Sequence, residues 1–123
     1  MSKRIFIVDD ADFIVDMLCL IMREAGYEVV GAAFNGEQAM GAIKKLPSQA
    51  LPDIITLDLH MPKIDGMETV NRIRALIPDV KIVLISSDAT MRVVMRARDA
   101  GIDAFIAKPF EPQTVLDTIA KLI

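Results

Sequence analysis

The chain has 123 residues, of which 53% are hydrophobic and 25% charged, and it carries a net charge of -3 at pH 7. This length suits one domain with its own core, and the apolar content excludes a disordered chain. Lysine and arginine are scattered, so no basic patch favours nucleic-acid binding. The first apolar run has four residues before two aspartates, too few for a signal peptide or a membrane span. One cysteine, Cys19, excludes an internal disulfide. We therefore expect one cytoplasmic domain over residues 1–123, without direct contact to nucleic acid or membrane.

Five apolar runs alternate with segments of helical periodicity. The runs predict strands over 4–8, 28–34, 53–58, 81–86 and 104–107, and the segments predict helices over 12–25, 36–46, 67–76, 91–100 and from 112 onward. Gly26, Pro47 and Gly101 are helix stops, while Thr90 and Pro112 suit helix starts. Continuous rather than alternating apolar strands are typical of a parallel sheet covered on both faces. The prediction is an α/β fold with a doubly wound, five-stranded parallel sheet and helices on both faces, flavodoxin-like (βα)5.

Polar residues follow four of the predicted strands at the point where each ends. Asp9 and Asp10 follow the first strand, Asp58 closes the third, Ser86 closes the fourth, and Lys108 follows the fifth. Singly, each is more simply a turn or cap residue. Together they fall at the carboxyl edge of a parallel sheet, where ligands bind, while the opposite edge holds no comparable cluster. The joint placement therefore predicts a site.

Three carboxylates packed together have raised pKa values unless a cation shares the site. Mg²⁺, or Mn²⁺ in its place, prefers oxygen ligands, which Asp10, Asp58 and a loop carbonyl can supply. A carboxylate can also act as a nucleophile and carry a phosphoryl group. The ammonium of Lys108 would offset phosphoryl charge, and the Ser86 hydroxyl could donate to a phosphoryl oxygen. The pattern predicts phosphoryl chemistry with a divalent cation.

The chain resembles the receiver domains of two-component response regulators along its whole length. Four motifs carry the resemblance: Val-Asp-Asp-Ala (8–11), Leu-Asp-Leu-His-Met-Pro-Lys-Ile-Asp-Gly (57–66), Ile-Ser-Ser (85–87) and Phe-Ile-Ala-Lys-Pro-Phe (105–110). The resemblance implies that Asp58 is the phospho-acceptor. It also implies that Asp10 binds Mg²⁺ directly, Asp9 largely through water, and His60 through its backbone carbonyl.

The resemblance further assigns a switch to the fourth and fifth strands. It implies that Ser86 is the switch hydroxyl, Phe105 the switch aromatic and Lys108 the lysine that contacts the phosphoryl group, with a cis bond before Pro109. Ser86 stands where many relatives have threonine, Phe105 where tyrosine is frequent, and Ser87 where alanine or glycine is usual. None of these departures disables the site, but Phe105 lacks a hydroxyl for any output contact that needs one.

The function implied is a phosphorylation-activated switch rather than a turnover enzyme. A histidine kinase or histidine phosphotransfer protein would donate the phosphoryl group. Partner binding would then change on the face formed by the fourth helix, fifth strand and fifth helix, toward an output protein or a dimer mate. Self-catalysed transfer and autodephosphorylation would be slow. The protein would stand alone, like chemotaxis regulators, or act as a phosphorelay carrier.

Two alternatives remain open from the sequence. The chain could be a receiver cut from a longer regulator with a DNA-binding or enzymatic output domain. It could also be a metal-dependent hydrolase that uses Asp58 as a transient nucleophile. Against the hydrolase, no separate acid–base pair lies near the motif and no substrate-cap insertion interrupts the chain.

Apolar residues beyond the core periodicity suggest partner surfaces. The first helix is apolar nearly all round, with Phe13, Val15, Cys19 and Leu20 besides its core stripe. We expect Phe13 and Leu20 to dock the donor's helical bundle.

The fourth helix offers Met91 and Met95 as an adaptable output surface, since methionine packs irregularly. We also expect His60 and Asp88 to border the path of attacking water and to tune the phosphoryl lifetime. An unchanged decay rate of the aspartyl phosphate in their alanine variants would contradict this.

Overall fold

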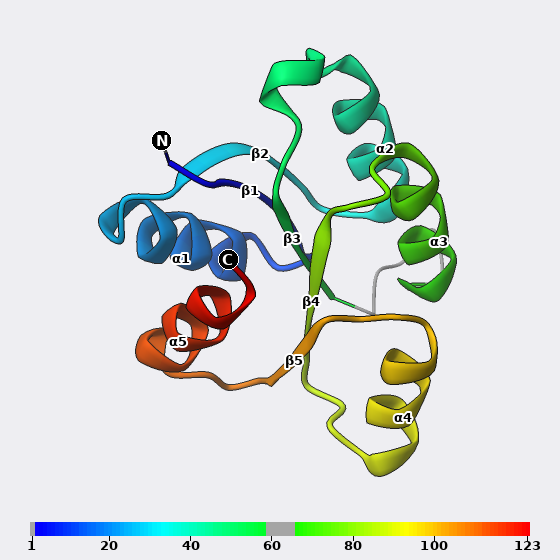
Figure 1. Cartoon of the computed structure of the whole chain (residues 1–123). Coiled ribbons are helices and arrows are strands. Elements are labelled where there is room, and N and C mark those ends of the chain that lie inside the picture. The colour runs from blue at the N-terminus through cyan, green and yellow to red at the C-terminus, as the bar shows by residue number, and fades with distance from the viewer. Residues whose placement is uncertain (1, 59–65) are drawn as a thin grey trace.

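A computed structural model of the chain describes residues 2–58 and 66–123 (Figure 1). Strands and helices alternate along these residues, and one short 3-10 turn, Ser48–Ala50, precedes the third strand. The elements are β1 Arg4–Val8, α1 Asp12–Glu24, β2 Glu28–Ala33, α2 Gly36–Lys45, β3 Ile54–Leu57, α3 Gly66–Leu76, β4 Lys81–Ser86, α4 Met91–Asp99, β5 Ala104–Ala107 and α5 Pro112–Leu122. Among the described helices, none has the length and apolar character needed to span a bilayer.

The five strands form one parallel sheet in the order β2-β1-β3-β4-β5. Helices α1 and α5 cover one face of this sheet, and α2, α3 and α4 cover the other (Figure 1). The strand order reverses at β1, so the carboxyl ends of β1 and β3 flank the switch point where ligands bind in such sheets. The predicted doubly wound, flavodoxin-like fold is confirmed.

Both faces of the sheet are apolar, which explains the continuous apolar strands. Alternate side chains of β1 enter different cores: Ile5 and Ile7 pack with α1 and α5, whereas Phe6 and Val8 pack with α2 and α3. Each core contains residues from the middle strands as well as from its own helices. Two-sided burial of this kind requires apolar residues at successive strand positions.

Most helix boundaries have local causes that the sequence already indicates. Gly26 and Gly101 follow α1 and α4 with φ of 91° and 81°, the left-handed conformation that glycine adopts without strain. The Thr90 side chain accepts the Val93 N–H at the start of α4 (3.4 Å). The cap of α2 was not predicted: Asn35 accepts the Gln38 N–H at 2.9 Å.

One close contact joins β1 to β2. The register shifts between Ile5 and Phe6, so that Phe6 pairs with Gly31 and Val30 has no partner on β1. A Cβ atom added to Gly31 would lie 2.6 Å from Cε2 of the Phe6 ring. That ring is fully buried and cannot move aside cheaply. Glycine is required here because the Phe6 ring occupies the space of a side chain.

We predict that Gly31→Ala destabilises the domain by about 1–3 kcal/mol, since overpacking forces the ring or the strand to shift. Chemical denaturation measures this difference. Gly41→Ala is the matched control, because its Cβ would meet no atom within 4 Å on the exposed side of α2. That change should be neutral or stabilising by about 0.5–1 kcal/mol. Adding Phe6→Leu should recover part of the Gly31→Ala loss, and strictly additive losses would contradict the clash.

Candidate functional site

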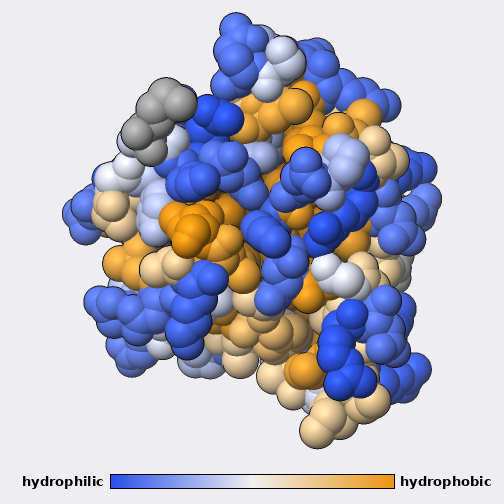
Figure 2. All heavy atoms as spheres, in the orientation of Figure 1, coloured by the Kyte–Doolittle hydropathy of each residue, from blue (hydrophilic) through white to orange (hydrophobic). Residues whose placement is uncertain are grey.

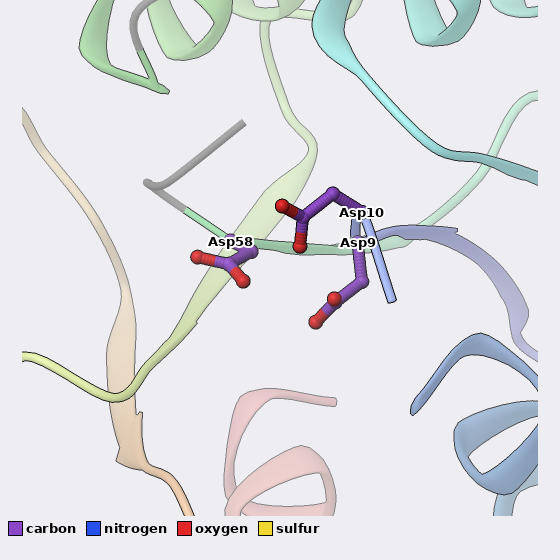
Figure 3. A group of neighbouring side chains, drawn as sticks. All are labelled: Asp9, Asp10 and Asp58. Carbon is purple, nitrogen blue, oxygen red and sulfur yellow. The ribbon is translucent and has the colours of Figure 1, made fainter. Parts of the chain in front are cut away.

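Three carboxylates gather where β1 and β3 end (Figure 3). Asp9 and Asp58 are buried, with 1% and 4% of their surface exposed, whereas Asp10 is exposed. One carboxylate oxygen from each of the three lies within 4.8 Å of those of the other two. Asp58 remains attached to the sheet although it lies just beyond β3, because its N–H donates to the Val8 carbonyl at 3.2 Å. The structure thus brings together the three acids that the sequence predicted.

Lys108 joins two of these acids. Its Nζ donates to Oδ2 of Asp9 at 2.7 Å and to Oδ2 of Asp58 at 2.8 Å. Its own N–H donates to the Ser86 carbonyl at 2.8 Å, and the Lys108–Pro109 peptide bond is cis, as the resemblance implied. The ammonium therefore connects residues that follow β1, β3 and β5.

Burial and charge shift the pKa values of this group in defined directions. Burial raises the pKa of Asp9 above its ordinary value, and the hydrogen bonds from Lys108 and from the Ala11 N–H oppose that rise only in part. Burial alone would lower the pKa of Lys108, but its hydrogen bonds to Asp58 and Asp9 and their negative charge outweigh burial and raise it. Lys108 is therefore a fixed positive charge in the site at neutral pH.

The donor set fits a hard divalent cation. All three side chains offer carboxylate oxygen, the ligand type that Mg²⁺ prefers, and the exposed Asp10 leaves one side open to solvent. Asp9 already uses both oxygens, since Oδ1 accepts the Ala11 N–H at 3.0 Å and Oδ2 accepts Lys108. That arrangement suits contact with a cation through water better than direct ligation. His60, the predicted carbonyl ligand, lies outside the described residues.

Ser86 begins a series of hydrogen bonds that leads to α4. The Ser86 hydroxyl is fully buried and accepts the Asp88 N–H at 3.1 Å. The Asp88 carboxylate accepts the Thr90 N–H at 3.2 Å, and Thr90 caps α4. The sequence singled out all three residues but not their connection, which depends on loop geometry. Phe105 is half-buried and pairs with Leu84 in the β4–β5 register.

The predicted surface residues are exposed, with one correction. Phe13 and Leu20 on α1 are 67% and 58% exposed, and Met91 and Met95 on α4 are 72% and 44% exposed. Val15, however, is buried in the core between α1, α5 and the sheet, so α1 is not apolar all round.

Met17, which the prediction omitted, completes the exposed stripe of α1 at 39%. A helical projection would have found it, because it lies four residues after Phe13 and three before Leu20. Cys19 is half-buried.

The opposite edge of the sheet also carries charges, but they differ from the cluster of acids at the carboxyl edge. A cavity of about 290 Å³ there is lined in part by Lys3, Arg4, Lys81, Asp53 and Asp79. These charges are of mixed sign, and Asp53 accepts the Arg4 backbone N–H at 2.8 Å. Among the residues that the structure describes, the two edges therefore differ in kind, because the carboxyl edge brings several carboxylates together in a buried place.

Comparison with known proteins identifies relatives along the whole chain. Residues 5–120 match the response regulator receiver domain family. The "Chemotaxis protein CheY" of Thermotoga maritima is 40% identical over 99% of this chain and 98% of its own.

Two solved structures have the same fold. A CheY-like receiver domain protein from Methanospirillum hungatei superposes with a TM-score of 0.87 at 29% identity, covering 99% of this chain and 94% of that one. CheY in a complex with CheX, BeF3 and Mg²⁺ from Borrelia burgdorferi gives 0.89 at 29% identity, covering 98% and 88%.

We predict that Lys108→Met destabilises the domain by about 3 kcal/mol at neutral pH, since it leaves buried carboxylates without their counter-charge. Without Lys108 the folded-state pKa of Asp9 rises further above its ordinary value. The folded state then binds more protons than the unfolded state, so stability falls as the pH rises from about 4 toward neutrality. Denaturant unfolding across this pH range measures the effect.

The control for this change is Lys121→Met, which removes an exposed lysine of α5. It should change the free energy of unfolding by less than about 0.5 kcal/mol, with no pH trend. A loss for Lys108→Met that is equal at all pH values would contradict the electrostatic account.

Proposed function

The chain belongs to the response regulator receiver domain family, and from that premise we propose that it is a signalling switch in which Asp58 accepts a phosphoryl group from a phosphohistidine donor. The observation that carries the proposal is the position of Lys108, 2.8 Å from Asp58 and 2.7 Å from Asp9. A carboxylate held in this way is oriented for attack, and the ammonium stays beside the phosphoryl oxygens as they arrive.

The transfer step is a single displacement at phosphorus. A carboxylate oxygen of Asp58 forms a bond to phosphorus as the bond between phosphorus and the donor's imidazole nitrogen breaks, and the imidazole leaves with that electron pair. Asp10, Asp58 and, through water, Asp9 would hold Mg²⁺. When bound, this cation offsets negative charge on the transferring group. The CheY relative from Borrelia burgdorferi was solved with Mg²⁺ and BeF3, which supports this assignment.

The switch would act through Ser86 and Phe105. The Ser86 hydroxyl can turn toward a phosphoryl oxygen and weaken its acceptance of the Asp88 N–H, which loosens the link to Thr90 and the start of α4. The half-buried Phe105 can then occupy the space that Ser86 vacates. Partner binding on the face of α4, β5 and α5 changes as a population shift driven by a local charge.

The donor would be a histidine kinase or a histidine phosphotransfer protein in the cytoplasm, and the exposed stripe of α1 would dock it. The domain would not be a turnover enzyme, because Asp58 carries the group until water slowly removes it. Asp88 is half-buried two residues after Ser86, and its N–H donates to the Ser86 hydroxyl, which supports a role for Asp88 in tuning that hydrolysis.

The first test is labelling by phosphoramidate with Mg²⁺, followed by intact mass spectrometry. The wild type should gain the mass of one phosphoryl group, and Asp58→Asn should gain none, because an amide is not a nucleophile of this kind. Asp79→Asn is the matched control at the opposite edge, and it should be labelled as the wild type is. Labelling of Asp58→Asn, or an unlabelled wild type, would refute the proposal.

The docking role of α1 predicts a difference between donors. Phe13→Ala and Leu20→Ala should slow transfer from a phosphorylated histidine donor domain about ten-fold, because each loses an exposed apolar contact. Labelling by phosphoramidate should proceed at the wild-type rate, since that donor needs no docking surface. Met91→Ala on α4 provides the control, with both rates unchanged. Equal slowing with both donors would contradict the docking role.

A further inference from the structure

A groove between α2 and α3 is not used by the phosphoryl site. It measures about 420 Å³ and is lined by Met40 and Lys44 of α2 and by Arg72, Ala75 and Leu76 of α3. Because both helices begin at the carboxyl edge of the sheet and run back from it, their last turns, with Lys44 and Leu76, lie far from the carboxylates. The groove thus combines an apolar floor with a cationic rim at the end of the domain remote from Asp58.

The rim of the groove is positive overall. Lys44 and the adjacent Lys45 are exposed at the end of α2, and Arg72 adds a third positive charge. Glu68 lies 3.1 Å from Arg72, but both side chains are about half exposed, so water and salt weaken their pairing. An apolar group flanked by carboxylates would complement this rim.

Helix α1 of this same chain presents such a surface. Phe13, Met17 and Leu20 are exposed at positions i, i+4 and i+7, the spacing of anchors that enter a groove between helices. The exposed Asp16 and Glu24 lie on or beside this stripe and outweigh the one positive charge of Arg23. Figure 2 shows how apolar patches on the surface are bordered by hydrophilic side chains.

We propose that the acidic, apolar stripe of α1 on one copy docks into the α2–α3 groove of a second copy. The two surfaces match in apolar character and have opposite charge. The stripe and the groove lie on opposite faces of the sheet (Figure 1), so the stripe of one molecule cannot reach its own groove. The contact between two copies therefore runs head to tail. A head-to-tail contact that does not close generates open chains. One helix in one groove buries less than the roughly 1,200 Å² of a standard interface, so the association is weak and concentration-dependent.

This self-association does not rest on phosphorylation. It has a consequence for the proposed docking of a donor, because both would use Phe13 and Leu20. A docked second copy covers the α1 surface that the donor would bind. At high concentration the chain would therefore receive phosphoryl groups from a protein donor more slowly than at low concentration.

Sedimentation velocity of the unphosphorylated full chain tests the proposal over roughly a hundred-fold range of concentration, up to about millimolar. The wild type should show a rising weight-average mass without a single end point. Met17→Glu disables the α1 stripe and Leu76→Glu disables the groove, so each alone should stay monomeric. An equal mixture of the two should form a one-to-one heterodimer, because one intact stripe meets one intact groove.

Charge reversal provides a second pair of variants at exposed positions, should either glutamate disturb folding. Asp16→Lys and Lys44→Glu should each weaken association about ten-fold, and the double variant should recover most of it. Met91→Glu on α4 is the control, which should associate as the wild type does.

Three results would overturn the proposal. These are a monomeric wild type at every concentration, a mixture of Met17→Glu and Leu76→Glu that stays monomeric, and association abolished by Met91→Glu.

Discussion

The position of one ammonium determines what this domain can do. Lys108 lies 2.7 Å from Asp9 and 2.8 Å from Asp58, both of which are nearly inaccessible to water. Burial raises the pKa of Asp9, and Lys108 supplies the counter-charge that opposes this rise. Without that counter-charge Asp9 would take up a proton more readily, and a protonated acid does not bind a hard cation. Since the three residues follow β1, β3 and β5, the same contact ties the edge strand to the centre of the sheet. The proposed nucleophile, the proposed cation site and one polar link between the ends of β1, β3 and β5 therefore share a single positive charge.

The helices differ in how firmly they are held, and this decides where a local change can spread. Helix α1 has five buried residues, whereas the one buried residue of α4 is Ala97. A helix with so little buried apolar surface has a low free-energy cost for shifting or fraying. Its start is fixed instead by polar contacts that lead back through Thr90 and Asp88 to the Ser86 hydroxyl. A change at Ser86 therefore acts on the α-helix that has the fewest buried residues in the described part of the chain.

The fold and the edge of the sheet that carries the site were predictable because both follow from patterns of residues along the sequence. Uninterrupted apolar strands imply two covered faces, and polar residues at strand ends imply one shared edge. The bulge that pairs Phe6 with Gly31 was not predictable, because a register shift changes pairing between strands without changing the pattern within either. Val15 was misassigned and Met17 was omitted for a related reason: listing apolar residues without projecting them around the helix cannot separate the core side from the outer side. The Asn35 cap was missed although the sequence carried its signal, since asparagine followed three residues later by Gln38 is a typical start of a helix.

The net charge of the three carboxylates and Lys108 explains the use of a neutral hydroxyl, that of Ser86, beside them. Three carboxylates and one ammonium leave an excess of two negative charges, which a bound divalent cation would cancel. Converting Asp58 from a carboxylate to an acyl phosphate then adds about one further negative charge. Neither the cation nor Lys108 can increase its own charge in response, so the remaining stabilisation must come from dipoles that can turn. Ser86 is such a group, fully buried at the end of β4 and engaged through its oxygen with a backbone N–H that it can release. In the proposed switch, the step that completes solvation of the phosphoryl group would also be the step that alters the start of α4.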